Sequence, residues 1–269
     1  MKNQNIEKTF FLFEAFWFAI TQVFGILLAK AVINLSQEEG RPIRQISSPD
    51  FSIAKFLISF FGTVVVIFLI TKLSRGKNII FKTLFTLVVF LGGEVFLTSF
   101  LPIIISLPLI LIMILFWFKN SSLWLHNLLL SFGIAGIGGL VGPSLSPEVV
   151  ISLFLVLSVY DLIAVYQTKH MVKIAKSMVE SQAILGMIIP KKFIDFKRKL
   201  KEVSIGDKER NFMVIGSGDI IFPLILATSF LPQGLLKTTV VLVFSLIGLY
   251  FGYWLFFRLG RRPMPALPP

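Results

Sequence analysis

The sequence of 269 residues is 55% hydrophobic and 15% charged, and its mean hydropathy is +0.86. A soluble domain usually carries about 25% charged residues, so this balance excludes an ordinary soluble enzyme and indicates an integral membrane protein. Cysteine is absent, which excludes disulfides, thiolate nucleophiles and cysteine-bound metals. The net charge of +12 comes largely from lysines and arginines in short loops, a pattern typical of membrane topology and not of nucleic-acid binding.

Apolar segments, each about long enough to cross a hydrocarbon core of about 30 Å, follow one another along the chain. They are continuously apolar and do not alternate, which favours helices over a barrel. The first lacks a small-residue cleavage site, so we interpret it as a retained helix and not as a signal peptide. We therefore predict an all-α, polytopic transmembrane helix bundle. The eight predicted spans are residues 10–33, 53–73, 79–101, 102–118, 123–141, 147–167, 212–231 and 235–257.

A polar segment between the sixth and seventh spans divides the chain. Residues 168–211 hold 11 Lys or Arg and five Asp or Glu. We predict three parts: residues 1–168 with the first six spans, a basic loop at 169–211, and residues 212–269 with the last two spans. Within the loop, apolar residues at helical spacing predict an amphipathic surface helix over 170–185. The high charge of 191–210 predicts disorder.

Positive charge lies mainly on one side of the predicted spans. Lysines and arginines follow the second, fourth, sixth and eighth spans, whereas the opposite connections are acidic or nearly uncharged. Because loops rich in Lys and Arg stay in the cytoplasm, we predict a cytoplasmic N-terminus and a cytoplasmic loop at 169–211.

Two of the five aspartates, Asp161 and Asp219, lie inside the sixth and seventh predicted spans. A carboxyl group at that depth costs about 3 kcal/mol on insertion scales, so it normally faces the bundle interior or a water cavity. The two spans run in opposite directions, and a rise of about 1.5 Å per residue places both carboxyls roughly 10 Å from the cytoplasmic surface. Neighbouring antiparallel helices would bring them to one level.

Two carboxyls close together in a low dielectric tend to share one proton. The ionised partner can then take a proton from water while the protonated partner protonates the scissile amide. The pair predicts aspartic protease chemistry with no metal or organic cofactor. Because one acid and one base are both needed, we expect activity to fall at both low and high pH, which a pH–rate profile measures.

The residues around the aspartates suit this chemistry. Gly216 and Gly218 remove side chains beside Asp219 and leave room for an extended peptide. Pro223, one turn further on, loosens the same helix. Tyr160 supplies an aromatic wall next to Asp161.

Three short motifs occur in order along the chain. They are Tyr160-Asp161 in the sixth span, Gly216-Ser217-Gly218-Asp219 in the seventh, and Pro265-Ala266-Leu267 near the C-terminus. Together they resemble the presenilin and signal peptide peptidase family of intramembrane aspartyl proteases, and most closely its stand-alone microbial presenilin homologues. The resemblance covers essentially the whole chain.

The resemblance implies an endopeptidase that cuts transmembrane peptides or proteins with Asp161 and Asp219 as catalytic residues. It also implies that Tyr160, Gly216, Ser217 and Gly218 shape the cleft, and that Pro265, Ala266 and Leu267 pack beside the aspartates to admit substrate. Membrane lipids are expected partners, accessory subunits are not required, and a homo-oligomer stays open. Family members have a ninth span that begins at the third motif, whereas this sequence ends two residues after Leu267, so eight spans are expected here.

Other functions fit part of the pattern. Paired intramembrane acids and glycine-broken helices also occur in cation-coupled transporters and ion channels, which are the main alternative. Prepilin peptidases share the glycine-aspartate motif and are a lesser alternative. Three further polar residues are expected to be structural: His126 as an interfacial ring, Glu94 as a hydrogen-bond partner of a neighbouring helix, and Glu14 as an acid near the membrane surface that reaches the interface or a lysine.

Overall fold

The computed structural model describes residues 2–41, 43–47, 58, 62, 77–162, 178, 181–203 and 212–258. Within these residues the chain is mostly helical. The α-helices are α1 (Lys2–Glu38), α3 (Lys77–Thr98), α4 (Ile103–Lys119), α5 (Leu123–Val141), α6 (Pro147–Leu162), α8 (Gly218–Ser229) and α9 (Leu235–Arg258). The strands are β1 (Gly186–Pro190) and β2 (Phe212–Gly216), and short 3-10 turns are η1 (Gly142–Ser144), η3 (Phe193–Lys197), η4 (Leu200–Glu202) and η5 (Leu231–Gln233).

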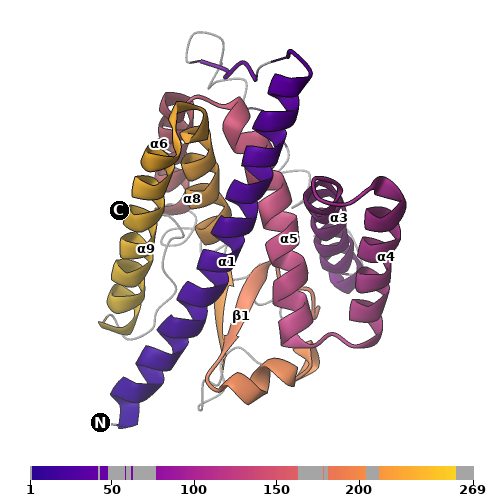
Figure 1. Ribbon diagram of the computed structural model, residues 1–269. Helices are drawn as coiled ribbons and strands as arrows, with labels where there is room; N and C mark the ends of the chain where they lie inside the picture. The colour runs from indigo at the N-terminus through magenta and orange to yellow at the C-terminus, as the bar shows by residue number, and fades with distance from the viewer. Residues whose placement is uncertain are drawn as a thin grey trace.

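Helices α1 and α5 form the middle of the bundle (Figure 1). Helices α3 and α4 lie on one side of this pair, and α6, α8 and α9 lie on the other. Helix α5 contacts α1, α3 and α8, while α8 contacts α6 and α9. The arrangement therefore places the two helices that carry the intramembrane aspartates against each other.

Small residues allow α3 and α5 to pack closely. A Cβ added at Gly136 would overlap the backbone of Gly92, and one added at Gly92 would overlap the backbone of Gly133. In lipid the hydrophobic effect contributes little to association between helices. Close approach of this kind supplies van der Waals contact that holds the helices together instead. Between α3 and α4 the Ser106 hydroxyl donates a hydrogen bond of 2.8 Å to Glu94, which confirms the predicted structural role of Glu94.

Four helical stretches in the described residues are long and apolar enough to cross a membrane: Thr9–Glu38, Ile79–Thr98, Leu123–Ser144 and Leu235–Leu255. Two further apolar helices, Ile103–Lys119 and Pro147–Val159, are shorter. These stretches agree with six of the eight predicted spans, although only four reach full length. The predicted span 53–73 lies almost entirely outside the described residues.

The seventh predicted span, 212–231, is wrong in its first part. Residues Phe212–Gly216 form strand β2, and helix α8 begins only at Gly218. Strand β2 pairs antiparallel with β1, so that Gly186 faces Gly216, Ile188 faces Val214 and Pro190 faces Phe212. The all-α prediction is therefore corrected to a mostly helical bundle with a two-stranded sheet.

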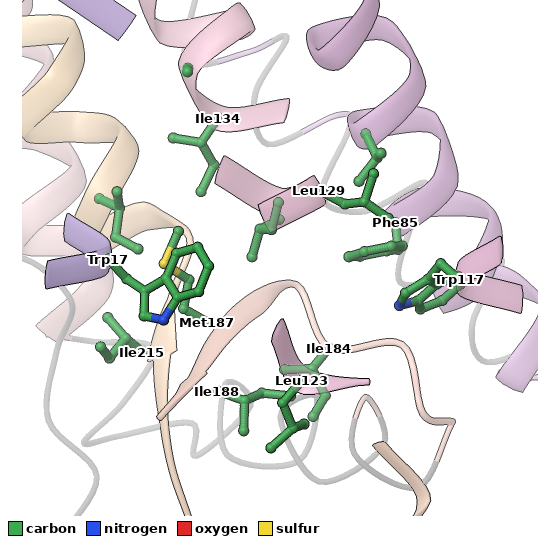
Figure 2. Close-up of a cluster of buried hydrophobic side chains, with 14 of the residues drawn as sticks. Trp17, Phe85, Trp117, Leu123, Leu129, Ile134, Ile184, Met187, Ile188 and Ile215 are labelled. Carbon is green, nitrogen blue, oxygen red and sulfur yellow. The ribbon is translucent and has the colours of Figure 1, made fainter. Parts of the chain in front are cut away.

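The sheet is held at one end of the bundle by a cluster of apolar side chains. All five residues of β1 are buried, and Met187, Ile188 and Ile189 are completely enclosed. Figure 2 shows part of this cluster, in which Trp17 of α1 and Leu123 of α5 join the strand residues. Burial of this surface fixes the strands against α1 and α5.

The predicted disorder of 191–210 is wrong over residues 191–203. Turns η3 and η4 are formed there, and Phe196 and Leu200 are 4% and 1% exposed. The Phe196 ring packs on Phe13 at 5.3 Å and on Trp17 at 6.2 Å. Apolar residues placed between the charges therefore anchor the segment to α1. Most of the predicted amphipathic helix 170–185 lies outside the described residues.

Candidate active site

Asp161 and Asp219 come from two helices that pack against each other. Asp161 is the penultimate residue of α6 and is 5% exposed. Asp219 is the second residue of α8, and the rings of Phe154 and Phe222 meet edge to face at 5.4 Å between the two helices. The carboxyl groups are near enough for the charge of Asp161 to act on Asp219. The last described turn of α6 and the first turn of α8 thus contribute to one acidic site.

The backbone changes from strand to helix immediately before Asp219. Strand β2 ends at Gly216, Ser217 is the N-cap, and Gly218 is the first helical residue. The Ser217 amide donates a hydrogen bond of 3.3 Å to Leu185 O, while Ser217 O accepts from the Ile221 amide at 2.9 Å. These bonds attach the start of α8 to the sheet. The sequence did not indicate that a strand lies before this helix.

Gly216 lies beside the Asp219 carboxyl, and its missing side chain leaves room there for a methyl group. A Cβ added at Gly216 would meet only the Asp219 side chain and the Gly218 backbone nitrogen within 4 Å, with Oδ2 nearest at 3.5 Å. The Oδ1 atom of Asp219 is enclosed and has no hydrogen-bond partner among the described residues. An enclosed acceptor of this kind costs free energy unless a ligand or a water molecule donates a hydrogen bond to it.

Helix α5 holds the sheet through two adjacent polar side chains, both completely buried. Asn127 donates a hydrogen bond of 2.9 Å to Ile188 O and accepts one of 3.0 Å from the Ile188 amide. The Nε2 atom of His126 lies 3.2 Å from Gly186 O, and its ring stacks on Phe85 at 4.6 Å. Asn127 thus occupies the edge of β1 as a further strand would.

The interfacial placement predicted for His126 is wrong, because the sheet covers the start of α5. Sequence reasoning also missed Asn127. Its side-chain amide lies inside an apolar segment, and a buried amide normally has a hydrogen-bond partner, so the sequence could have indicated a structural role for Asn127.

Glu14 is a third acid near the pair. It is 6% exposed, its Oε2 has no hydrogen-bond partner among the described residues, and it interacts electrostatically with Asp219. The side chain therefore faces the interior of the bundle and does not reach outward to an interface as the sequence suggested. The neighbouring Trp17 and Phe18 are also buried.

Not every expected site residue can be placed. Tyr160 lies in α6 beside Asp161, but only its backbone belongs to the described residues. Pro265, Ala266 and Leu267 lie outside them. The described part of the chain therefore brings Asp161, Asp219, Gly216, Ser217 and Gly218 together.

A bundle of apolar helices with two adjoining intramembrane aspartates defines the class of intramembrane aspartyl proteases. The sequence profile described as "Signal-peptide peptidase, presenilin aspartyl protease" matches residues 15–269. The chain belongs to this family of intramembrane-cleaving hydrolases. Because the family is integral to the membrane, its substrates are transmembrane.

A search of curated proteins found no match. Among solved structures, this chain is similar to a presenilin family intramembrane aspartate protease in space group C222. The two share 21% sequence identity over 96% of this chain and 93% of the other, with a TM-score of 0.59. At this identity the likeness supports the fold.

Proposed function

We propose that Asp161 and Asp219 are the catalytic pair with which this protease hydrolyses transmembrane peptides. The observation that carries the assignment is the placement of two acids on adjoining apolar helices, α6 and α8, near enough for the charge of one to act on the other. Both residues lie on one chain, so the proposed chemistry needs no second subunit.

The pair would act on a water molecule held between the carboxyls. One ionised carboxylate takes a proton from the water, whose oxygen attacks the scissile carbonyl carbon. The other, protonated carboxyl donates its proton toward the amide as the C–N bond breaks, which releases a new carboxylate and a new amine. A low dielectric strengthens these interactions and favours one shared proton over two charges.

The outer edge of β2 is the proposed binding edge for an extended substrate. Asn127 bonds both the amide and the carbonyl of Ile188, so these two groups point away from β2. Val214 is paired with Ile188 in the antiparallel sheet, and its own amide and carbonyl therefore point away from β1, toward the outer edge of β2. No described strand pairs with that edge, and Val214 is 36% exposed. A peptide added there would run toward Gly216 and Asp219.

The membrane orientation belongs to the same proposal. We assign the end of the bundle with the α1 N-terminus, the sheet and turn η3, which contains Lys197, to the cytoplasm, since positive residues favour that side. Eight spans, and the division into residues 1–168, 169–211 and 212–269, are proposed on the apolar pattern of the whole sequence. The cleft roles of Tyr160 and of Pro265, Ala266 and Leu267 are proposed on the family motifs.

The direct test is cleavage of a labelled transmembrane peptide by the purified chain in detergent and in liposomes. We expect defined fragments with the unaltered protein and none with Asp219→Ala, while both proteins show the same thermal unfolding. The same liposomes should show no ion or solute flux. Flux without fragments would instead support the transporter or channel alternative.

A further inference from the structure

Side chains of α3 and α4 line an open apolar groove. Figure 1 shows these two helices on the side of the bundle away from α6 and α8. Its volume is about 670 Å³, within the range of about 300–1,000 Å³ common for small-molecule sites. The α3 part of its lining includes Leu87, Phe90 and Leu91, and the α4 part includes Leu111, Ile114 and Phe118. Leu87 and Leu91 are 50% and 53% exposed, so the groove offers apolar surface to lipid chains.

A basic pocket adjoins one end of this groove. It has a volume of about 260 Å³ and shares Lys82 and Phe118 with the groove. Three more lysines line it: Lys119 at the end of α4, Lys199 before η4 and Lys201 within η4. In the described part of the chain none of the four lysines forms an ion pair, and no carboxylate lines the pocket.

Two hydrogen-bond donors near these lysines lack an acceptor among the described residues. Trp117 lines the basic pocket, is 2% exposed, and has an enclosed indole N–H without a partner. Thr86 lines the groove, and its enclosed hydroxyl also has no partner. A ligand with acceptor oxygens at this level would satisfy donors that otherwise cost free energy.

The lining changes from charged to polar to apolar along one face of α3. Lys82, Thr86 and Phe90 follow at intervals of four residues, so each lies about 6 Å above the one before. A glycerophospholipid has the same order: a phosphate, then ester carbonyls, then acyl chains. We propose that this groove and pocket together bind one anionic phospholipid, with its phosphate among the four lysines and an acyl chain between α3 and α4.

The bound lipid would join two parts of the molecule. The Lys199 segment is attached to α5, because the Leu123 amide donates to Arg198 O at 3.0 Å and the Leu200 amide donates to Ser121 O at 2.9 Å. A phosphate held by Lys82 of α3 and Lys199 would therefore fasten this segment to the α3–α4 side of the bundle. Each lysine near an anionic headgroup adds favourable attraction that high salt weakens.

The test is lipid binding to the delipidated full chain, measured by native mass spectrometry and by thermal unfolding. We expect one phosphatidylglycerol molecule to bind and to raise the unfolding temperature, whereas phosphatidylcholine and inorganic phosphate do neither. The double variant K199Q/K201Q should weaken phosphatidylglycerol binding about tenfold or more. Its matched control, K192Q/K197Q, removes two charges from the same loop but not from the pocket, and should bind as the unaltered chain does.

A second variant separates binding from folding. Leu87→Trp fills the groove at an exposed position, so it should abolish lipid binding while the unfolding temperature without lipid stays unchanged. Equal binding of phosphatidylcholine, equal weakening in the control double variant, or full binding by Leu87→Trp would each overturn the proposal. Stabilisation by inorganic phosphate as large as that by the lipid would show a free-anion site and would also overturn it.

Discussion

Asp219 stands where strand β2 gives way to helix α8, and each residue around it has a distinct physical role. Gly216 leaves space beside its carboxyl, Ser217 joins the strand to the helix, and Asp161 acts on it from α6. The sequence draws attention to both aspartates because an acid inside an apolar span is costly, and their catalytic role stays a prediction. It was not sufficient to place Glu14, whose burial depends on how α1 packs against α5 and α8.

Filling the space at Gly216 should reduce activity without unfolding the protein. The Cβ of Gly216→Ala would lie 3.5 Å from Asp219 Oδ2, an ordinary contact that costs little stability but displaces a peptide approaching the carboxyl. We expect cleavage to fall on the order of 100-fold, as small misplacements at a reacting centre do. The control is Gly248→Ala in α9, where nothing lies within 4 Å of the new Cβ. This variant should cleave the peptide at the normal rate. Normal cleavage by Gly216→Ala would contradict the assigned role of this space.

Replacing Glu14 should make the protein more stable and less active. Its buried Oε2 lacks a hydrogen-bond partner among the described residues, so Glu14→Met, of similar length, should raise the free energy of unfolding by about 1–3 kcal/mol. Because the acid interacts electrostatically with Asp219, the same change should lower the cleavage rate. Thermal unfolding and a cleavage assay on one preparation measure both effects. A less stable variant with full activity would show that Glu14 is only a packing residue.

At the scale of elements, the sheet positions the start of α8 and therefore Asp219, and α5 positions the sheet. The sequence could not reveal this, because Gly186–Pro190 and Phe212–Gly216 are short apolar runs beside longer apolar segments, and periodicity does not distinguish such runs from helix. The hydrogen bonds that decide the conformation come from Asn127, 61 residues away from Ile188 in the chain. Helices of full span length, such as α3 and α5, were predicted because their apolar runs are long enough to be unambiguous.

Removing the Asn127 side chain should loosen β1 and, through β2, the start of α8. Asn127→Ala leaves the buried amide and carbonyl of Ile188 without partners, which should cost about 1–3 kcal/mol of unfolding free energy. We expect faster hydrogen exchange at the Ile188 amide and a broader set of cut positions in a transmembrane peptide.

Ser131→Ala is the matched control for this change. Ser131 is buried one turn further along α5, and its hydroxyl donates to Asn127 O and accepts from Thr21, both outside the sheet. It should lower stability while leaving both the exchange at Ile188 and the cut positions unchanged. If Asn127→Ala also left the cut positions unchanged, the sheet would not set the register of the substrate.

At the scale of the whole molecule, the bundle places its acidic pair on one side and its proposed lipid site on the other, with α1 and α5 between them (Figure 1). Membership of the protease family and the helical fold both agree with the sequence motifs. The number of spans was hard to predict, because α8 has 12 residues, fewer than a usual span, and derives its position from packing against α5, α6 and α9. Composition alone does not encode that packing.

The central claim, that Asp161 and Asp219 act as one catalytic unit, is tested most directly by comparing two single variants with their combination. We would measure kcat/KM on one transmembrane peptide for Asp161→Asn, Asp219→Asn and the double variant, each with verified thermal unfolding. Residues that act together are strongly non-additive, so we predict that all three fall to the same background rate. Substantial cleavage by either single variant, or a double variant far slower than both singles, would contradict the shared-proton pair.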